Sequence, residues 1–272
     1  MSITAPDGGP IARPFKPVFV ADWTDALFVH YAVDPAALRP LVPRPLDLDV
    51  RDGKAFISLV AFTQRRLRPR LGGRLTAFLS RPLAEHHFLN VRSYVRHAGE
   101  AGIYFLAEWI PNRLACLLGP RLYGLPYRLG KLDYRRDAGG FEAIVSSETQ
   151  QLHFVAGFRR TSEPSRAERG TLDEFLVERY SAFTVRGRAL YRFRIEHAPW
   201  KLQPADVEMR ETNLLGTVAA LLSTPVAAQG SEGVRDVLIG AAERCELTPG
   251  GNPRSKLRGR WGQHAIDYFA AK

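Results

Sequence analysis

The chain has 272 residues, a formal net charge of +10 and 45% hydrophobic residues, the proportions of a globular protein with a sizeable core. It has no run of about eighteen apolar residues, which excludes a membrane-spanning helix. The first sixteen residues contain no apolar segment of the kind that a signal peptide needs, and residues 1–16 are therefore predicted to be a flexible leader.

Arginine supplies most of the positive charge, and it is scattered along the whole chain. A basic protein suits nucleic acid, an acidic membrane surface or an anionic small molecule. Zinc-finger spacing, a helix-turn-helix pattern and an RNA-binding signature are all absent, which argues against nucleic acid. The two cysteines, Cys116 and Cys245, lie far apart in apolar settings, and they predict free thiols and a cytoplasmic location.

Strand patterns dominate the first part of the chain. Residues 26–32 and 54–62 are apolar on both faces, as in buried strands, with His30 as a polar exception in the first. Between them, Asp34 is a helix N-cap residue that predicts a short helix. Residues 63–85 are rich in arginine and predict a long loop.

The next segments alternate between polar and apolar residues. Residues 88–97 predict a half-buried strand, and residues 103–109 return as its neighbour after a hairpin turn. Residues 112–123 predict a helix that the dipeptide Gly119-Pro120 disturbs. The remaining strand patterns cover residues 132–134, 141–149, 150–159 and 188–196.

The strongest helix pattern covers residues 171–183, because Thr171 and Glu174 form a capping box. A shorter helix is predicted over 212–222. Strands that follow one another directly favour antiparallel pairing over βαβ units. The sequence therefore predicts an α+β fold, with one curved or closed, mostly antiparallel sheet and a few peripheral helices. Residues 17–245 would form this single domain, followed by a basic C-terminal extension at 246–272.

Several blocks of the sequence resemble the DUF2071 group, also called YqjF-like, in the acetoacetate decarboxylase-like superfamily. The order of the blocks along the chain is more specific than any one of them. They cover residues 27–62, 88–106, 121–132, 171–180 and 197–206. The resemblance implies one domain in which mostly antiparallel strands close into a cone-like β-barrel around a small-molecule cavity.

The resemblance also identifies the corner GLPYRLG, residues 124–130, as the place that carries two adjacent lysines in true acetoacetate decarboxylases. There the first lysine forms a Schiff base with the substrate and the second lowers its pKa. This chain has Tyr127 and Arg128 instead, and neither can form an imine, since a guanidinium stays protonated. Lys131 would lie about 13 Å further along a strand, so we expect it at the surface or at the cavity rim.

Arg92 and Tyr94 share one face of a predicted strand, where they would offer an anion-binding fork and a hydroxyl donor if that face lines the cavity. A solvated outer face is the alternative. Glu108 stands among apolar residues, so its pKa would be raised if it is buried, as suits a general acid or base. It could instead lie at an exposed strand end or pair with an arginine.

The remaining candidates have structural alternatives of the same kind. His30 is either a core histidine satisfied by a backbone carbonyl or a catalytic one. Arg179 predicts a buried ion pair with Glu178 or another acid, and Trp200, after a rigid His-Ala-Pro turn, packs on aromatic residues or stacks on a substrate.

These residues favour a small-molecule enzyme without a Schiff-base lysine, which would stabilise an oxyanion and move protons on a keto acid or polyketide-like substrate. Decarboxylase, dehydratase and cyclase chemistry all fit. The candidate catalytic residues are Glu108, Tyr127, Tyr94 and His30, and the candidate substrate-binding residues are Arg92, Arg128 and Trp200.

Two other functions stay open: a non-catalytic binding protein for a small apolar carboxylate, and a basic surface module for nucleic acid or acidic lipid. No metal-ligand spacing, dinucleotide motif or phosphate loop occurs, so we predict neither a metal nor a cofactor. The expected partner is an anionic or ketonic small molecule. The sequence leaves open whether the chain forms a homo-oligomer.

Overall fold

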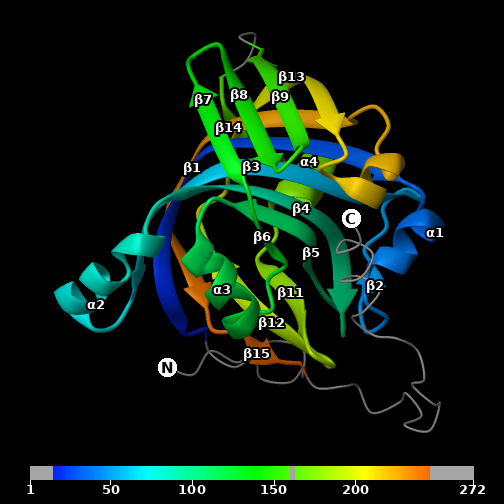
Figure 1. Ribbon diagram of the computed structural model, residues 1–272. Helices are drawn as coiled ribbons and strands as arrows, with labels where there is room; N and C mark the ends of the chain where they lie inside the picture. The colour runs from blue at the N-terminus through cyan, green and yellow to red at the C-terminus, as the bar shows by residue number, and fades with distance from the viewer. Residues whose placement is uncertain (1–14, 160–162, 246–272) are drawn as a thin grey trace, which may run out of the picture.

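The computed structural model describes residues 15–159 and 163–245, and these residues form one fifteen-stranded sheet with a few short helices (Figure 1). The predicted leader falls almost entirely outside the described residues, and the predicted C-terminal extension falls wholly outside them. The strands are β1 (Pro17–Val33), β2 (Asp47–Leu48), β3 (Ala55–Pro69), β4 (His86–His97), β5 (Glu100–Ile110), β6 (Tyr127–Leu129), β7 (Lys131–Arg136), β8 (Gly140–Ser147), β9 (Gln150–Phe158), β10 (Ser165–Arg166), β11 (Ser181–Arg186), β12 (Ala189–Glu196), β13 (Lys201–Thr212), β14 (Ala227–Gly240) and β15 (Glu243–Arg244). The helices are α1 (Pro35–Leu38), α2 (Gly73–Leu79), α3 (Arg113–Leu122) and α4 (Leu172–Val177), with 3₁₀ segments η1 (Arg39–Leu41), η2 (Arg81–Leu83) and η3 (Gly216–Leu221).

The pairings of the central strands run in a ring. The order is β12–β11–β5–β4–β3–β1–β14, and β14 pairs again with β12, where Ile195 lies opposite Ile239. Within this ring only the β5–β11 pair is parallel. The prediction of a curved, mostly antiparallel sheet with few helices is therefore confirmed.

Apolar side chains on the outer face of the ring pack against a second layer. Strands β13, β9, β8 and β7 continue from β14 and fold over β1, β3 and β4 (Figure 1). Leu27, Leu59 and Val91 from the ring meet Val145 and Phe154 of the second layer in one buried cluster. Burial of both faces explains why β1 and β3 are apolar without alternation.

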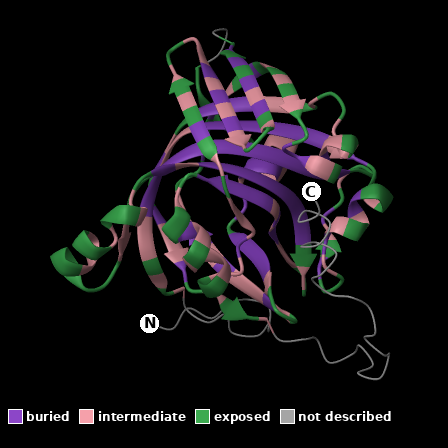
Figure 2. Cartoon of the chain, viewed as in Figure 1, coloured by how far each residue is buried: buried purple, intermediate pink, exposed green. Residues whose placement is uncertain are grey.

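The opposite face of the same strands points inward and forms what we call the inner cluster, to which every strand of the ring contributes. Its members include Phe28, Val60, Phe88, Phe105, Ala182, Phe193 and Val234, with Leu176 from α4. Successive residues of a strand point to opposite faces, so the residues next to these in sequence lie on the other face. Figure 2 shows that the central strands of the ring are buried along most of their length.

Four segments differ from their predictions. The helix predicted over 212–222 is shorter and of the 3₁₀ type, since β13 ends at Thr212 and η3 covers Gly216–Leu221. Residues 63–85 do not form a loop, because β3 continues to Pro69 and is followed by α2 and η2. The helix predicted over 171–183 ends at Val177, because residues 181–186 pair with β12 as β11. Helix α3 continues through Pro120 to Leu122, which places that proline within its last turn. None of the described helices is long and apolar enough to cross a lipid bilayer.

Candidate active site

Polar side chains on the inner face form two neighbouring rows that cross the strands. In the first row, Ser58 of β3 is the register partner of both His30 on β1 and Arg92 on β4. Register partners on one face lie about 5 Å apart at Cβ. All three residues are at most 9% exposed, so the sheet brings a base, a hydroxyl and a cation together inside the protein.

The second row lies two residues further along the strands, at a distance of about 7 Å. Asn90 of β4 pairs with Glu108 of β5, and Glu108 pairs in turn with Tyr127 of β6. A bulge between Val91 and Arg92 adjusts the register between the two rows. Such bulges redirect side chains near functional sites, and this one lets both rows point inward.

A chain of hydrogen bonds determines which ring nitrogen of His30 carries the proton. The Tyr94 hydroxyl donates to the carbonyl of Leu176 at 2.8 Å, because a carbonyl only accepts. The Ser58 hydroxyl then donates to Tyr94, and the remaining Ser58 lone pair accepts from His30 Nδ1 at 2.6 Å. His30 is therefore the Nδ1–H tautomer, and its Nε2 is an unprotonated base without a hydrogen-bond partner among the described residues.

The surroundings of His30 keep the ring neutral. Burial and the positive charge of Arg92 lower the pKa of His30 to about 3. The Gln229 side chain lies next to the ring, and its Oε1 also has no hydrogen-bond partner in the described part of the chain. When Nε2 takes up a proton, the resulting N–H can donate a hydrogen bond to that oxygen.

Arg92 carries the permanent positive charge of the inner face. Its Nη2 donates to the carbonyl of Leu176 at 3.1 Å, and the guanidinium carbon lies 5.9 Å from the ring centres of both Phe28 and Tyr94. Its Nε is buried and has no partner among the residues described. The guanidinium is thus anchored and still has hydrogen-bonding capacity, as an anion-binding group requires.

Glu108 is a buried carboxyl group to which none of the described residues supplies a counter-charge. It is 3% exposed, its Oε2 has no hydrogen-bond partner, and it makes no ion pair with any described residue. Burial therefore raises its pKa well above 4.5. The side-chain oxygen Oδ1 of Asn90 beside it also has no hydrogen-bond partner within the described chain, so this row offers unused hydrogen-bonding groups to a ligand.

Tyr127 owes its position to the cramped corner between α3 and β6. A Cβ atom at Gly119 would lie 2.3 Å from Tyr127 Cε2, so only glycine lets α3 pack against this ring. The Tyr127 ring also lies near the Phe88 ring, with 5.9 Å between the two ring centres. Burial and the neighbouring Glu108 raise the pKa of Tyr127, which keeps its hydroxyl a hydrogen-bond donor.

The other two candidate residues, Arg128 and Trp200, do not belong to either row. Arg128 follows Tyr127 on β6 and so takes the opposite face, where its guanidinium lies 5.1 Å from the Trp109 ring. Trp200 is buried in the inner cluster, with its ring edge on Phe28 at 5.0 Å and nearly parallel to Trp23 at 6.4 Å. It forms an aromatic wall beside Phe28.

Every lysine in the described part of the chain is exposed to solvent. Lys131 stands at the start of β7, outside the ring. The others are Lys16, Lys54 and Lys201. Within the described residues, no amine reaches the inner face.

A pocket of about 700 Å³ opens at the end of the ring where β4 and α4 meet. Its floor includes Arg179, whose guanidinium lies 4.1 Å from the Phe175 ring and 5.3 Å from the Tyr94 ring. The pocket is therefore separated from the first row by these stacked side chains. Its arginine residues are Arg51, Arg96, Arg166, Arg169 and Arg179.

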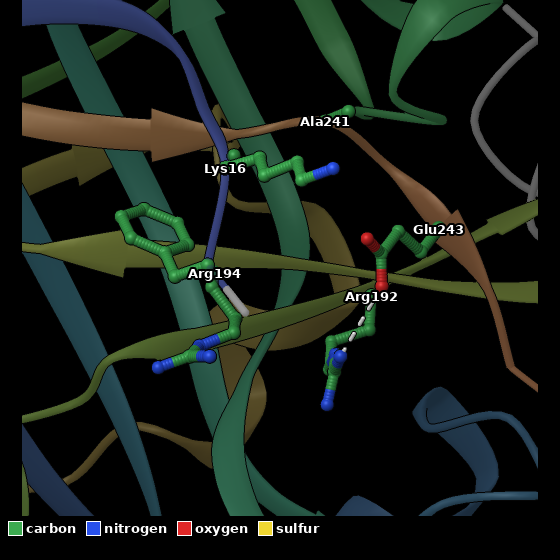
Figure 3. A pocket seen from close by; sticks show the side chains of 7 residues that line it. Lys16, Arg192, Arg194, Ala241 and Glu243 are labelled. Carbon is green, nitrogen blue, oxygen red and sulfur yellow. Dashed lines mark hydrogen bonds and ion pairs between the residues drawn. The ribbon is translucent and has the colours of Figure 1, made fainter. Parts of the chain in front are cut away.

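The buried ion pair predicted for Arg179 is formed with Asp49 and not with Glu178. Arg179 Nη1 donates to Asp49 Oδ2 at 2.7 Å, and both side chains are less than 10% exposed. Glu178 instead accepts from the backbone N–H of Trp200 at 2.9 Å. A second hollow, between β12 and the start of β1, has room for about one water molecule and is lined by Lys16, Arg192, Arg194 and Glu243 among others (Figure 3).

Sequence reasoning missed Ser58, Gln229 and Asp49. Ser58 is the one polar residue within the apolar segment FISLV. A polar residue inside an apolar strand is the same sequence signal that pointed to His30. Gln229, on β14, and Asp49, directly after β2, lie in segments for which the sequence predicted no strand. The described residues contain no cluster of three or more histidine, cysteine or acidic side chains that could hold a metal ion.

Solved structures with this fold are acetoacetate decarboxylase-like proteins. An acetoacetate decarboxylase-like enzyme from Sphingomonas wittichii RW1 superposes with a TM-score of 0.61 at 16% identity, over 85% of this chain and 94% of that one. The acetoacetate decarboxylase from Legionella pneumophila subsp. pneumophila str. Philadelphia 1 gives 0.64 at 14% identity, over 90% and 98%. The enduracididine biosynthesis enzyme MppR, complexed with the condensation product of pyruvate and imidazole 4-carboxaldehyde, gives 0.63 at 14% identity, over 88% and 98%. At such low identities, these TM-scores establish a shared fold alone.

Sequence comparison gives the family. The model of DUF2071, described as an uncharacterized conserved protein, matches residues 20–235. The protein YqjF of Bacillus subtilis (strain 168) is 34% identical over 209 residues, which are 76% of this chain and 81% of YqjF. The chain therefore belongs to the DUF2071 family.

Proposed function

We propose that this protein is an enzyme for a keto acid or polyketide-like substrate, of the decarboxylase, dehydratase or cyclase type, which works without a Schiff-base lysine. In this proposal the ring of strands is a cone-like barrel, and its inner face is the wall of the substrate cavity. The observation that carries the proposal is the arrangement of Arg92 between an unprotonated base, His30 Nε2, and an uncompensated carboxyl, Glu108.

Each group has a role that its environment supports. Arg92 binds the substrate carboxylate or a developing enolate, and the Tyr127 hydroxyl donates a hydrogen bond to the same oxyanion. In a decarboxylation, the bond to the carboxyl carbon breaks, its electron pair moves onto the carbonyl oxygen and carbon dioxide leaves. Protonated Glu108 then gives its proton to the resulting carbanionic carbon. In a dehydration, His30 Nε2 removes the proton next to the carbonyl, the C–H electron pair forms a carbon–carbon double bond, and the β-hydroxyl leaves as water with the proton of Glu108. In a cyclisation, the same electron pair instead attacks a second carbonyl carbon of the substrate, whose oxygen takes the proton of Glu108.

Two further observations support this substrate class and the absence of an imine. MppR, which shares the fold, is complexed with pyruvate in one structure and with a pyruvate condensation product in another. All lysines of the described residues are exposed, as set out above. Covalent catalysis by a lysine would require an amine at the substrate carbonyl.

The test is turnover of a panel of β-keto acids, and of pyruvate with aldehydes, followed by NMR with the full chain. We expect consumption of at least one substrate, loss of turnover in Glu108→Gln with substrate affinity retained, and no covalent adduct after borohydride treatment. An adduct on a lysine, or unchanged turnover in Glu108→Gln, would overturn the proposal.

The pocket at the end of the ring favours a second candidate, a binding protein for a small apolar carboxylate. Five arginines, three acidic residues and the Phe175 ring line this pocket. The positive charges outnumber the negative ones, which suits an anionic group joined to an apolar body. Arg166→Ala, in this pocket, and Arg92→Ala, in the first row, separate the candidates once a ligand is found. Affinity lost in Arg166→Ala supports the binding protein, and turnover lost in Arg92→Ala with affinity retained supports catalysis.

A further inference from the structure

The segment around α2 projects from the body of the protein and exposes large apolar side chains. Figure 1 shows α2 standing away from the ring beyond the end of β3, and Figure 2 shows that it is largely exposed. Leu71, Leu75, Phe78 and Leu79 are 83%, 68%, 61% and 67% exposed. Leu75, Phe78 and Leu79 follow the i, i+3, i+4 spacing and therefore share one face of the helix.

The fold holds this short helix in place. A helix of seven residues would not be stable by itself in water, but the Thr76 hydroxyl donates to the carbonyl of Leu71 at 3.0 Å and the Ser80 N–H donates to the carbonyl of Thr76 at 3.0 Å. At its base, the Leu67 N–H donates to the carbonyl of Ala84 at 3.1 Å. These hydrogen bonds hold α2 as a helix, so its apolar face is exposed to solvent as an ordered surface.

The charged residues of the segment that carries this apolar face are all positive. Residues 65–84 contain six arginines and no acidic residue. The three nearest to the body are neutralised there, since Arg65, Arg66 and Arg68 pair with Glu85, Asp22 and Asp236. Arg70, Arg74 and Arg81 make no ion pair with any described residue. Arg81 lies over the Phe78 ring at 5.6 Å, next to the apolar face.

We propose that α2 and its flanking arginines form a docking surface for an anionic lipid membrane. Leu75, Phe78 and Leu79 would enter the boundary between headgroups and acyl chains, and Arg70, Arg74 and Arg81 would contact the anionic headgroups. A second copy of this chain fits less well, because a two-fold contact would bring the same unpaired cations face to face. Nucleic acid would use the cations and leave the apolar face in water.

The test is co-sedimentation of the full chain with vesicles of phosphatidylcholine, with and without phosphatidylglycerol. We expect binding that needs phosphatidylglycerol. It should weaken about tenfold or more when Leu75→Ser and Phe78→Ser are combined, because two buried apolar contacts are lost. Arg70→Gln with Arg74→Gln should weaken binding as well. The matched controls are Val155→Ser, 46% exposed on β9, and Arg188→Gln, exposed in the turn after β11, which should bind as the wild type does.

Three results would overturn the proposal. The first is a wild-type chain that does not bind phosphatidylglycerol vesicles. The second is binding that the apolar variant leaves unchanged, with equal affinity for DNA, which would indicate a purely electrostatic or nucleic-acid surface. The third is a dimer that the apolar variant converts to a monomer, which would assign α2 to a contact between copies.

Discussion

Glu108 and Tyr127 are register partners in the parallel strands β5 and β6, where Glu108 is buried and Tyr127 is half-buried against the inner cluster. Burial raises the pKa of both groups, and the charge of Glu108 raises that of Tyr127 further. Each group therefore disfavours the ionised form of the other. We expect both to be hydrogen-bond donors near neutral pH, which is the state that a developing oxyanion and a carbanion require.

The first prediction concerns the pH dependence of stability that Glu108 imposes. A carboxyl group whose folded pKa lies above its unfolded value stabilises the folded state less as pH rises from about 4.5 toward the folded pKa. The variant Glu108→Gln keeps the shape of the neutral form and removes this dependence. Chemical denaturation between pH 5 and pH 9 should therefore show wild-type stability falling relative to the variant. A constant difference across this range would contradict a buried, uncompensated carboxyl.

The second prediction concerns His30, whose pKa shift has the opposite consequence. The unfolded histidine binds a proton near pH 6.5 and the folded one only near pH 3, so the folded state loses stability as pH falls between these values. For one proton the slope is about 1.4 kcal/mol per pH unit. The difference in unfolding free energy between the wild type and His30→Asn should therefore decrease by about this amount for each unit by which pH falls. NMR should also find that the His30 ring does not titrate between pH 5 and pH 8.

The third prediction tests the hydrogen-bonded chain that orients His30. In Tyr94→Phe the carbonyl of Leu176 and the Ser58 hydroxyl lose a partner in a buried setting, which should cost about 1–3 kcal/mol of stability. Tyr104→Phe is the matched control, because the Tyr104 hydroxyl has no hydrogen-bond partner among the described residues. Equal losses of unfolding free energy in the two variants would show that the chain of hydrogen bonds contributes nothing.

The fourth prediction concerns the ion pair between Asp49 and Arg179. Removing one partner leaves the other charge buried and unpaired, so Asp49→Asn should cost about 3–5 kcal/mol. Arg179→Met in the same chain should recover part of that loss, because the stranded charge is gone. The exposed pair of Asp206 with Arg159 is the control, and Asp206→Asn should leave the unfolding midpoint unchanged. Additive losses at Asp49 and Arg179 would contradict a coupled pair.

Several elements could be predicted from local sequence because their cause is local. The alternation of residues 88–97 placed Arg92 and Tyr94 on one face, and the structure puts that face inside. The apolar stretch 26–32 with its one histidine gave the buried strand that carries His30. The capping box of Thr171 and Glu174 fixed the start of α4, where the Glu174 N–H donates to Thr171 Oγ1.

Other features depend on contacts between distant segments, which no local pattern records. Helix α4 ends early because residues 181–186 find strand partners in β12 and β5. Asp49 meets Arg179 across 130 positions of sequence. Arg128 and Tyr127 lie on opposite faces of β6. The resemblance to the family identified the corner that carries both residues, but it did not indicate which of the two points inward.

The central claim is that Glu108 is a protonated acid inside the protein, and infrared difference spectroscopy of wild type against Glu108→Gln at pH 7 tests it without knowledge of the substrate. We expect a carbonyl band of a protonated carboxylic acid that the wild type has and the variant lacks. A difference spectrum with only ionised carboxylate bands would contradict the account, because Glu108 would then have no proton to give.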